Sequence, residues 1–220
     1  RLFILEDGAQ GFGGMIGNKR ACSFGDISTT SFFPAKPLGC YGDGGAVFTD
    51  NDEWAALADS YRVHGKGMFK YDNVRIGMNS RLDTLQAAIL KIKFKAFREY
   101  ELRDINKAAA LYTKLLAGRV KTPVTPEGYY SSWAQYTICL NSREERDALQ
   151  ACLKEQGIPS MVYYPTPMHG QTAYKALNAP TDCCPTAKRL CDTVLSLPVH
   201  PYITEEEIET VCSVILGFVR

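Results

Sequence analysis

The chain is organised around the stretch TSFFPAKPLGCYGDGG, residues 30–45. This stretch places Lys36 between Pro34 and Pro37, with two phenylalanines before it and four glycines after it. Proline fixes its own φ and restricts the residue before it, whereas glycine permits positive φ and close backbone approach. The pattern therefore predicts a tight, rigid loop that presents the Lys36 amine at one defined point.

A lysine held in such a loop can do covalent chemistry. An amine that is shielded from water can form a Schiff base with a carbonyl compound. The alternative is a solvated surface turn, which is the usual situation of a lysine. The residues upstream of the loop favour the chemical role.

An acidic pair follows the apolar run Leu2–Leu5 near the start of the chain. We expect this run to form a strand of the kind buried at the centre of a parallel sheet. Residues Glu6–Gln10 would then lie at the carboxyl end of the strand, where open α/β sheets bind their ligands. Because a buried strand at the extreme terminus is unusual, we expect that earlier residues are missing.

The rest of the chain predicts alternating strands and helices. Further strands are expected at residues 24–33, 46–49, 133–140 and 158–164, and helices after the capping residues 50–52 and at 82–116, 143–156, 181–194 and 204–219. The helix at 82–116 is long enough to connect two domains or to lie in a subunit interface. The proline- and glycine-containing residues 118–128 predict a boundary between a large domain, 1–117, and a small α/β domain, 118–220.

Composition argues against several classes of function. The 220 residues are 45% hydrophobic and 22% charged with a formal net charge of +1, which gives no reason to expect nucleic acid or a membrane surface as partner. No apolar run is long enough to span a bilayer. The eight cysteines show no C-x-x-C pair and no histidine at ligand spacing. We therefore interpret them as reduced thiols of a cytoplasmic protein, with no metal and no disulfide.

Two residues after the first predicted strand, Asp7 and Gln10, and two in the stretch 30–45, Ser31 and Lys36, make chemical sense together. A carboxylate at a strand end, such as Asp7, can keep a pyridine nitrogen protonated and so make the ring of pyridoxal phosphate (PLP) an electron sink. Lys36 can bind the aldehyde of that cofactor, and Ser31 can donate a hydrogen bond to its phosphate. Gln10 completes the set, although Asp7 taken alone is more typical of a turn or a helix cap.

Several motifs occur together along the chain. They are EDxAQ at 6–10, SFxPxKxLG at 31–39, GDGGA at 42–46, RxHG at 62–65, GMNSRL at 77–82, QAA at 86–88 and LPxHP at 197–201. In this order they resemble the DegT/DnrJ/StrS family of PLP-dependent sugar aminotransferases. The resemblance covers essentially the whole chain, and several motifs in order are far more specific than any one alone.

The resemblance implies a fold. The chain would contain part of the large domain of a fold-type I PLP transferase, an α/β domain with a mostly parallel sheet and covering helices. A long connecting helix and a small α/β domain would follow. Members of the family also carry a segment before the Asp7 strand that grips the cofactor phosphate, so we expect the isolated chain to bind PLP poorly and to be inactive.

The same resemblance implies roles in the PLP-binding domain. Lys36 would bind the cofactor covalently and, once released, move a proton between cofactor and substrate. Asp7 would pair with the pyridinium nitrogen, Gln10 would lie near the ring, and Ser31 would bind the phosphate. Asn79 would reach the cofactor phosphate of the neighbouring subunit, which makes the active site a property of a homodimer.

Substrate-binding residues are implied on weaker grounds. Arg81 would bind an anionic group of the substrate. Tyr163, Tyr164 and His169 match a small-domain stretch that borders the sugar, with Tyr163 at a position where relatives often carry histidine. Relatives that dehydrate sugars carry histidine at the position of Lys36, so the lysine indicates amino transfer. His64 and His200 receive no role.

The implied reaction transfers an amino group from glutamate to a nucleotide-linked keto sugar, for cell-surface polysaccharide or amino-sugar biosynthesis. Residues 71–77 and 81–86 resemble most closely the members that act on UDP-linked 3-keto sugar acids. Two alternatives stay open. One is a non-catalytic or regulatory homologue of the same fold, and the other is an unrelated α/β module that uses the lysine loop to bind an anion or a nucleotide.

Overall fold

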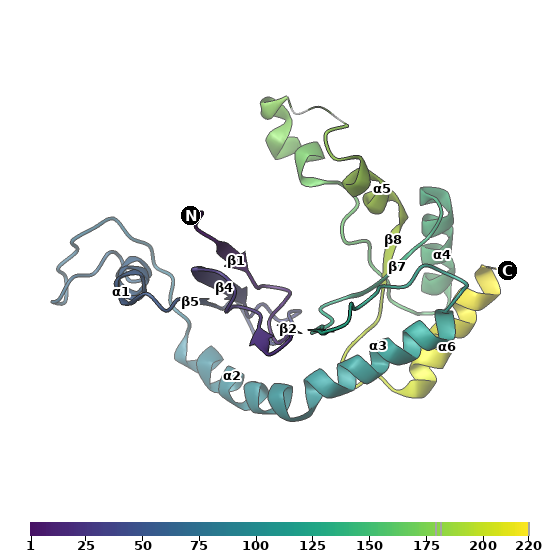
Figure 1. Ribbon diagram of the computed structural model, residues 1–220, viewed down its shortest axis with the longest axis horizontal. Helices are drawn as coiled ribbons and strands as arrows, with labels where there is room; N and C mark the ends of the chain where they lie inside the picture. Colours follow the sequence, from purple (N-terminus) through teal and green to yellow (C-terminus); the bar gives the residue numbers. More distant parts are fainter. Residues whose placement is uncertain (179, 181, 220) are drawn as a thin grey trace. The chain divides into compact units, whose positions relative to one another are not determined.

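The structure is a computed structural model that describes residues 1–178, 180 and 182–219 (Figure 1). It divides into two compact units, the first formed by Arg1–Arg103 and Thr125–Ala134 and the second by Asp104–Val124 and Gln135–Arg220. The division falls inside a helix, whereas the sequence predicts a domain boundary at 117/118. No helix in the described part of the chain has the length and apolar character needed to cross a membrane.

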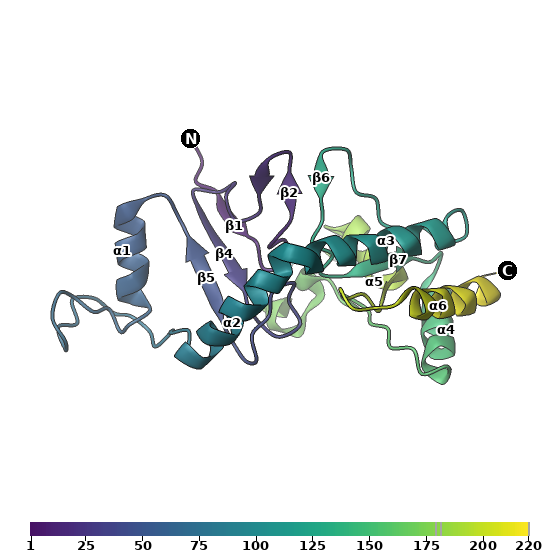
Figure 2. The same ribbon diagram turned by 90° about the horizontal axis from the view of Figure 1, so that it is seen from below.

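The main sheet of the first unit has three strands in the order β1-β4-β5 (Figure 2). Its strands are β1 Leu5–Asp7, β4 Ile27–Ser31 and β5 Gly45–Phe48. β1 runs parallel to β4, and β5 runs antiparallel to it. The sheet is therefore mixed in the described residues, whereas the sequence predicts a mostly parallel one.

The expectation of a buried central strand at Leu2–Leu5 is wrong for this structure. Only Leu5 of the run belongs to β1, and Leu2 and Phe3 are 87% and 81% exposed. Within the described residues β1 pairs with β4 alone, so it is an edge strand. An apolar run predicts a strand but does not tell how many neighbours cover it.

A second, small sheet completes the first unit. It consists of β2 Met15–Ile16, β3 Lys19–Arg20 and β6 Tyr129–Tyr130 in the antiparallel order β3-β2-β6. Strands of two residues show no alternation of apolar and polar side chains, which is why sequence periodicity did not reveal them.

Helix α1, Asp52–Tyr61, confirms the predicted cap. The side chain of Asn51 accepts a hydrogen bond of 3.0 Å from the backbone N–H of Trp54. Such a bond satisfies one of the donors that the first turn of a helix leaves without a partner.

The long helical stretch is also confirmed, with one irregularity. It consists of α2 Thr84–Ala96, a π-helical turn Phe97–Glu101, and α3 Leu102–Leu116, in which the two units meet along the chain. At the π turn, the Phe97 ring stacks on Phe12 at a centroid distance of 5.9 Å. Gly13 lies beside it at φ +94°, where an added Cβ would be 2.5 Å from the Phe97 ring. Glycine is therefore required for the chain to pass this close to the helix.

The core of the first unit lies beneath the lysine loop. Its buried members come from the loop and from the long helix: Phe32, Leu38, Cys40, Leu90, Phe97 and Leu102. The loop that carries Lys36 is thus one wall of this core and not a loose connection.

The second unit has a two-stranded antiparallel sheet of β7 Tyr136–Cys139 and β8 Val194–Leu197. Along the chain, α4 Arg143–Glu155 follows β7, α5 Pro185–Thr193 precedes β8, and α6 Glu205–Phe218 follows β8. Two short 3₁₀ helices, Met168–Gly170 and Thr172–Leu177, lie between α4 and α5 in the sequence. Thr204 and Glu207 form a reciprocal capping box at the start of α6. The predicted helices 143–156 and 204–219 are confirmed.

The predicted strand at 158–164 is wrong. Only Met161 pairs there, in an isolated bridge with Ser196. Pro159 lies inside the segment and cannot donate a ladder hydrogen bond, which disfavours a regular strand. The partner of β7 is β8. Its first residue, Val194, is the last residue of the helix that the sequence predicts over 181–194. Because β8 is buried at all four positions, it lacks the alternation that identifies a strand.

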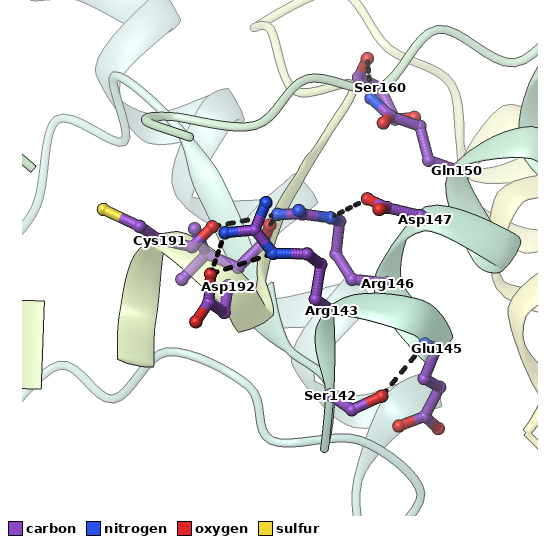
Figure 3. Close-up of polar contacts among 10 residues, drawn as sticks. Ser142, Arg143, Glu145, Arg146, Asp147, Gln150, Ser160, Cys191 and Asp192 are labelled. Atoms are coloured by element: carbon purple, nitrogen blue, oxygen red, sulfur yellow. Dashed lines mark hydrogen bonds and ion pairs between the residues drawn. The ribbon is translucent and has the colours of Figure 1, made fainter. Parts of the chain in front are cut away.

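A buried arginine joins three elements of the second unit. Arg146 of α4 is only 3% exposed. Its Nε donates to Oδ1 of Asp147 at 2.6 Å, and its Nη1 donates to the carbonyl oxygens of Cys191 and Val194 at 3.1 and 3.3 Å (Figure 3). Arg146 thereby satisfies carbonyl groups at the end of α5 and the start of β8.

We expect the substitution Arg146→Ala to lower the free energy of unfolding by about 3 kcal/mol, because it leaves buried carbonyl groups without a donor. The matched control is Arg143→Ala on the same helix, since Arg143 pairs with Asp192 at the surface (Figure 3). Surface ion pairs contribute little to stability, so the control should change it much less. Urea unfolding of both variants measures the difference, and equal losses would show that the buried contacts are not responsible.

Candidate active site

The lysine loop is closed at its base by backbone hydrogen bonds. The N–H of Phe32 donates to the carbonyl oxygen of Gly44 at 2.7 Å, and the N–H of Cys40 donates to that of Phe32 at 2.8 Å. Within the loop, the N–H of Lys36 donates to the carbonyl oxygen of Phe33 at 2.9 Å. The structure therefore contains the tight loop that the prolines and glycines predict.

Packing also holds this loop in place. Leu38 and Cys40 are 4% and 0% exposed, and the Cys40 thiol donates to the carbonyl oxygen of Phe32 at 3.0 Å. A Cβ at Gly39 would lie 2.5 Å from the carbonyl oxygen of Pro34, so only glycine fits there. Lys36 itself is half-buried. The anchors of the loop are its neighbours, which leaves the lysine amine available for chemistry.

The two adjacent acids have different surroundings. The half-buried Glu6 accepts backbone N–H groups from Cys22 at 2.6 Å, Phe24 at 2.8 Å and Gly25 at 3.2 Å. Asp7 is exposed, and its Oδ1 accepts the N–H of Ala9 at 3.0 Å. Successive residues of a strand point to opposite faces, which separates the two side chains. Glu6 is thus a structural acid, a role that the sequence analysis did not assign.

Asp7 and Ser31 are brought to the same edge of the sheet. β1 and β4 are parallel, and Asp7 lies opposite Thr29 in the register. Because alternate residues of a strand share a face, Asp7, Thr29 and Ser31 lie on one face of this strand pair. Ser31 is the last residue of β4, and the lysine loop begins directly after it. The carboxylate, the hydroxyl and the lysine loop therefore belong to one edge.

Gln10 lies in the turn that leaves β1. The N–H of Gly8 donates to the carbonyl oxygen of Thr29 at 2.8 Å, and the N–H of Phe12 donates to that of Gly8 at 3.0 Å. The carbonyl oxygen of Gln10 accepts the Ser132 hydroxyl at 3.1 Å, while its side chain is exposed. Gln10 thus remains at the edge that carries Asp7.

Asn79 and Arg81 follow α1 in the chain and share an open hollow with Thr29 and Thr30 of β4. Arg81 Nη1 donates to Oδ1 of Asn79, and both residues line an open hollow of about 1450 Å³. None of Asp7, Gln10, Ser31 and Lys36 lines this hollow within the described chain. The hollow is larger than the about 300–1,000 Å³ of typical small-molecule sites, so it is not a closed ligand pocket.

The backbone around Asn79 is held by an adjoining segment. The N–H of Ser80 donates to the carbonyl oxygen of Arg62 at 2.9 Å, and the N–H of His64 donates to that of Met78 at 2.9 Å. A Cβ at Gly77 would lie 2.1 Å from the backbone nitrogen of Gly65, so the crossing requires glycine. The bond between His64 and Met78 joins backbone atoms of both residues, so it does not use the imidazole of His64.

Tyr163, Tyr164 and His169 belong to the second unit. The two tyrosines are 40% and 58% exposed, with ring centroids 5.4 Å apart. His169 is half-buried in the 3₁₀ helix Met168–Gly170, and ligand atoms of Cys183 and Cys184 lie within 4.8 Å of it and of each other. The sequence does not predict this grouping, because the two cysteines are adjacent and form no C-x-x-C pair with the histidine at ligand spacing.

Comparisons with known proteins agree with one another. The model of the DegT/DnrJ/EryC1/StrS aminotransferase family matches residues 1–216. UDP-2-acetamido-2-deoxy-3-oxo-D-glucuronate aminotransferase of Pseudomonas aeruginosa is 42% identical over 211 residues, which are 96% of this chain and 56% of the relative. The "Pleiotropic regulatory protein" of Geobacillus stearothermophilus is 42% identical, over 100% of this chain and 59% of the relative.

A solved structure shows the same likeness. The crystal structure of a DegT DnrJ EryC1 StrS aminotransferase from Brucella abortus is 47% identical, with a TM-score of 0.93 over 99% of this chain and 57% of the other. The chain thus spans little more than half the length of the proteins that it matches.

Proposed function

This chain belongs to the DegT/DnrJ/EryC1/StrS aminotransferase family, and we propose that its protein transfers an amino group to a nucleotide-linked keto sugar. The fold is that of the fold-type I PLP transferases. PLP is the cofactor that this family implies, and solved structures of the same fold include PLP and PMP forms. The observation that carries the proposal is the rigid loop that presents Lys36 at the edge of β1 and β4 where Asp7 and Ser31 lie.

The residues at this edge fit PLP by their chemistry. The cofactor needs an amine for its aldehyde, a carboxylate for its ring nitrogen and donors for its phosphate, and Lys36, Asp7 and Ser31 offer these groups. Asp7 is exposed, and the described hydrogen bond to its carboxylate comes from a single backbone N–H. Its second oxygen can therefore accept the proton-bearing nitrogen of the ring.

Each residue then has a defined task. PLP, when bound, supplies an electron sink for the carbon that gains or loses the amino group. Lys36 Nζ would bind the aldehyde carbon and would afterwards take the proton from one reacting carbon and return it to the other. Asp7 would keep the ring nitrogen protonated, Ser31 would donate to the phosphate, and Gln10 would lie beside the ring.

We place Asn79 in the active site of a partner copy in a homodimer. The proposal is supported by the position of Asn79 in a hollow that Lys36 does not line. If Asn79 serves the partner, co-expressing the Lys36→Ala and Asn79→Ala variants should restore activity that neither has alone. Half of the dimers would be mixed with one intact site each, so about a quarter of the wild-type activity is expected. Activity no higher than the mean of the two variants would contradict a shared site.

For the substrate we propose a UDP-linked 3-keto sugar acid, with glutamate as the amino donor. The name of the Pseudomonas aeruginosa relative and the likeness of residues 71–77 and 81–86 support this choice. Arg81 would bind an anionic group, and Tyr163, Tyr164 and His169 would border the sugar. Nucleotide sugars and eight free thiols fit a cytoplasmic enzyme.

Amine formation with matched 3-keto and 4-keto UDP-sugars tests the substrate. We expect kcat/KM to be at least about tenfold higher for the 3-keto sugar acid, which is within the range that pocket contacts supply. Exclusive use of the 4-keto substrate would overturn this assignment while leaving amino transfer itself intact.

A regulatory, non-catalytic homologue remains the second candidate, because one similar relative is named a pleiotropic regulatory protein. Mass spectrometry after borohydride reduction with PLP separates the two, since only the enzyme should gain cofactor mass on the peptide that contains Lys36. A protein that binds PLP without this modification would support the regulatory role. The family match excludes the unrelated α/β binding module.

A further inference from the structure

The second unit contains a group of three metal-ligating side chains that the proposed reaction does not require as a group. One ligand atom each of His169, Cys183 and Cys184 lies within 4.8 Å of the other two. His169 is half-buried, and the two cysteines are exposed. All eight cysteines of the chain, these two included, are free thiols. The three side chains can therefore meet at one point without breaking another covalent bond.

Backbone hydrogen bonds hold the chain both at His169 and at the two cysteines. The N–H of Gly170 donates to the carbonyl oxygen of Pro167 at 2.9 Å, which closes the 3₁₀ turn around His169. On the other side, the N–H of Cys183 donates to the carbonyl oxygen of Pro180 at 3.2 Å. Cys184 directly precedes α5, a helix with proline in its first turn. A negative thiolate at this helix end interacts favourably with the helix dipole.

The separation of the two sulfurs fits a metal. Cys183 Sγ and Cys184 Sγ are 3.8 Å apart. A tetrahedral zinc ion with bonds of about 2.3 Å to two sulfurs holds those sulfurs about 3.8 Å apart. The histidine nitrogen has to lie about 3.5 Å from each sulfur in such a site, and in the structure it lies within 4.8 Å of both.

A disulfide between the two cysteines fits less well. The Cα atoms of adjacent residues are about 3.8 Å apart across a trans peptide. Disulfides usually join Cα atoms about 4.4–6.8 Å apart, so bonding neighbours stores strain. Two thiolates and an imidazole also suit zinc and similar thiophilic ions, whereas magnesium and calcium prefer oxygen ligands.

We propose that His169, Cys183 and Cys184 bind one zinc ion through three protein ligands, with the fourth position left to water. The proposed amino transfer does not require this metal, and the site differs from the absence of metal that the sequence predicts. Its occupancy would have a consequence for the enzyme, because His169 cannot bind zinc and contact the sugar through the same nitrogen.

Cobalt replaces zinc in the test because it reports its ligands by absorption. One equivalent of Co²⁺ added to the reduced, metal-free protein should produce sulfur-to-cobalt charge-transfer absorption, and Zn²⁺ should abolish it. Cys183→Ser, Cys184→Ser and His169→Ala should each weaken Zn²⁺ binding at least about tenfold, since losing even an outer partner of a metal ligand costs that much. Cys191→Ser and His200→Gln are the matched controls and should bind as the wild type does.

Two results with cobalt would overturn the proposal. One is the absence of charge-transfer absorption in the wild type, and the other is absorption that persists in the double variant Cys183→Ser/Cys184→Ser. Thermal unfolding in the presence of a chelator shows whether each variant is folded. A further measurement needs no variant: Zn²⁺ should protect Cys183 and Cys184 from alkylation in the wild type, as read by mass spectrometry, and equal labelling with and without Zn²⁺ would reject the site.

Discussion

In the active enzyme that contains this chain, replacing Lys36 by alanine is expected to lower kcat for amino transfer by at least about 10,000-fold, because the variant loses both the covalent attachment of the cofactor and the group that moves the proton. The protein should remain folded. Leu38 and Cys40 anchor the loop in the core, and the backbone bonds at Phe32 and Gly44 close its base. Those contacts do not involve the lysine side chain.

The result becomes specific when two further variants are measured beside it. Lys36→Arg keeps the positive charge but has no amine that can condense with an aldehyde, so it should be as inactive as the alanine variant. Lys107→Ala removes a lysine that is exposed on α3 and pairs with Asp104, and it should retain the wild-type kcat. Activity of Lys36→Ala within tenfold of the wild type would refute the role of the lysine loop.

The parts of the fold that follow from local chemistry could be predicted from the sequence. Asn51 caps α1, Thr204 caps α6, and the helical pattern over 82–116 forms a continuous helical stretch. In each case the signal lies within a few residues of the structure that it causes. The tight loop around Lys36 belongs to the same class, because its prolines and glycines restrict the backbone directly.

The parts that depend on distant residues could not be predicted. β8 was missed because all of its positions are buried against other elements, so no alternation marks it. The exposure of Leu2 and Phe3 depends on which strands pair with β1 and not on their own hydrophobicity. The grouping of His169 with Cys183 and Cys184 likewise depends on the folded chain, because adjacent cysteines do not match the C-x-x-C spacing of common zinc sites.

The candidate site shows the same division between local and distant information. The sequence indicates an acidic pair at a strand end, and the structure separates its members. Glu6 is turned to the backbone of residues 22–25, whereas Asp7 faces the side of Thr29 and Ser31. The alternation of strand side chains predicts that the two acids differ, but only the position of the 22–25 segment tells which one is structural.

This separation leads to opposite expectations for the two acids. Asp7→Asn should lower kcat about 100- to 10,000-fold, since a neutral amide cannot keep the ring nitrogen protonated. Its stability should match the wild type, because the asparagine oxygen can still accept the N–H of Ala9. Saturating PLP in the assay ensures that a lower kcat is not merely a loss of bound cofactor.

Glu6→Gln should instead reduce stability and spare the chemistry of the folded enzyme. The carboxylate accepts three backbone N–H groups, from Cys22 on one oxygen and from Phe24 and Gly25 on the other. Glutamine has one acceptor oxygen, and its NH₂ group would face a donor, so at least one N–H loses its partner at a cost of about 1–3 kcal/mol. Urea unfolding and kcat measured on both variants give the comparison. The assignment of the two acids would be wrong if Glu6→Gln lost kcat at unchanged stability. It would also be wrong if Asp7→Asn lowered the free energy of unfolding while the folded enzyme kept its kcat.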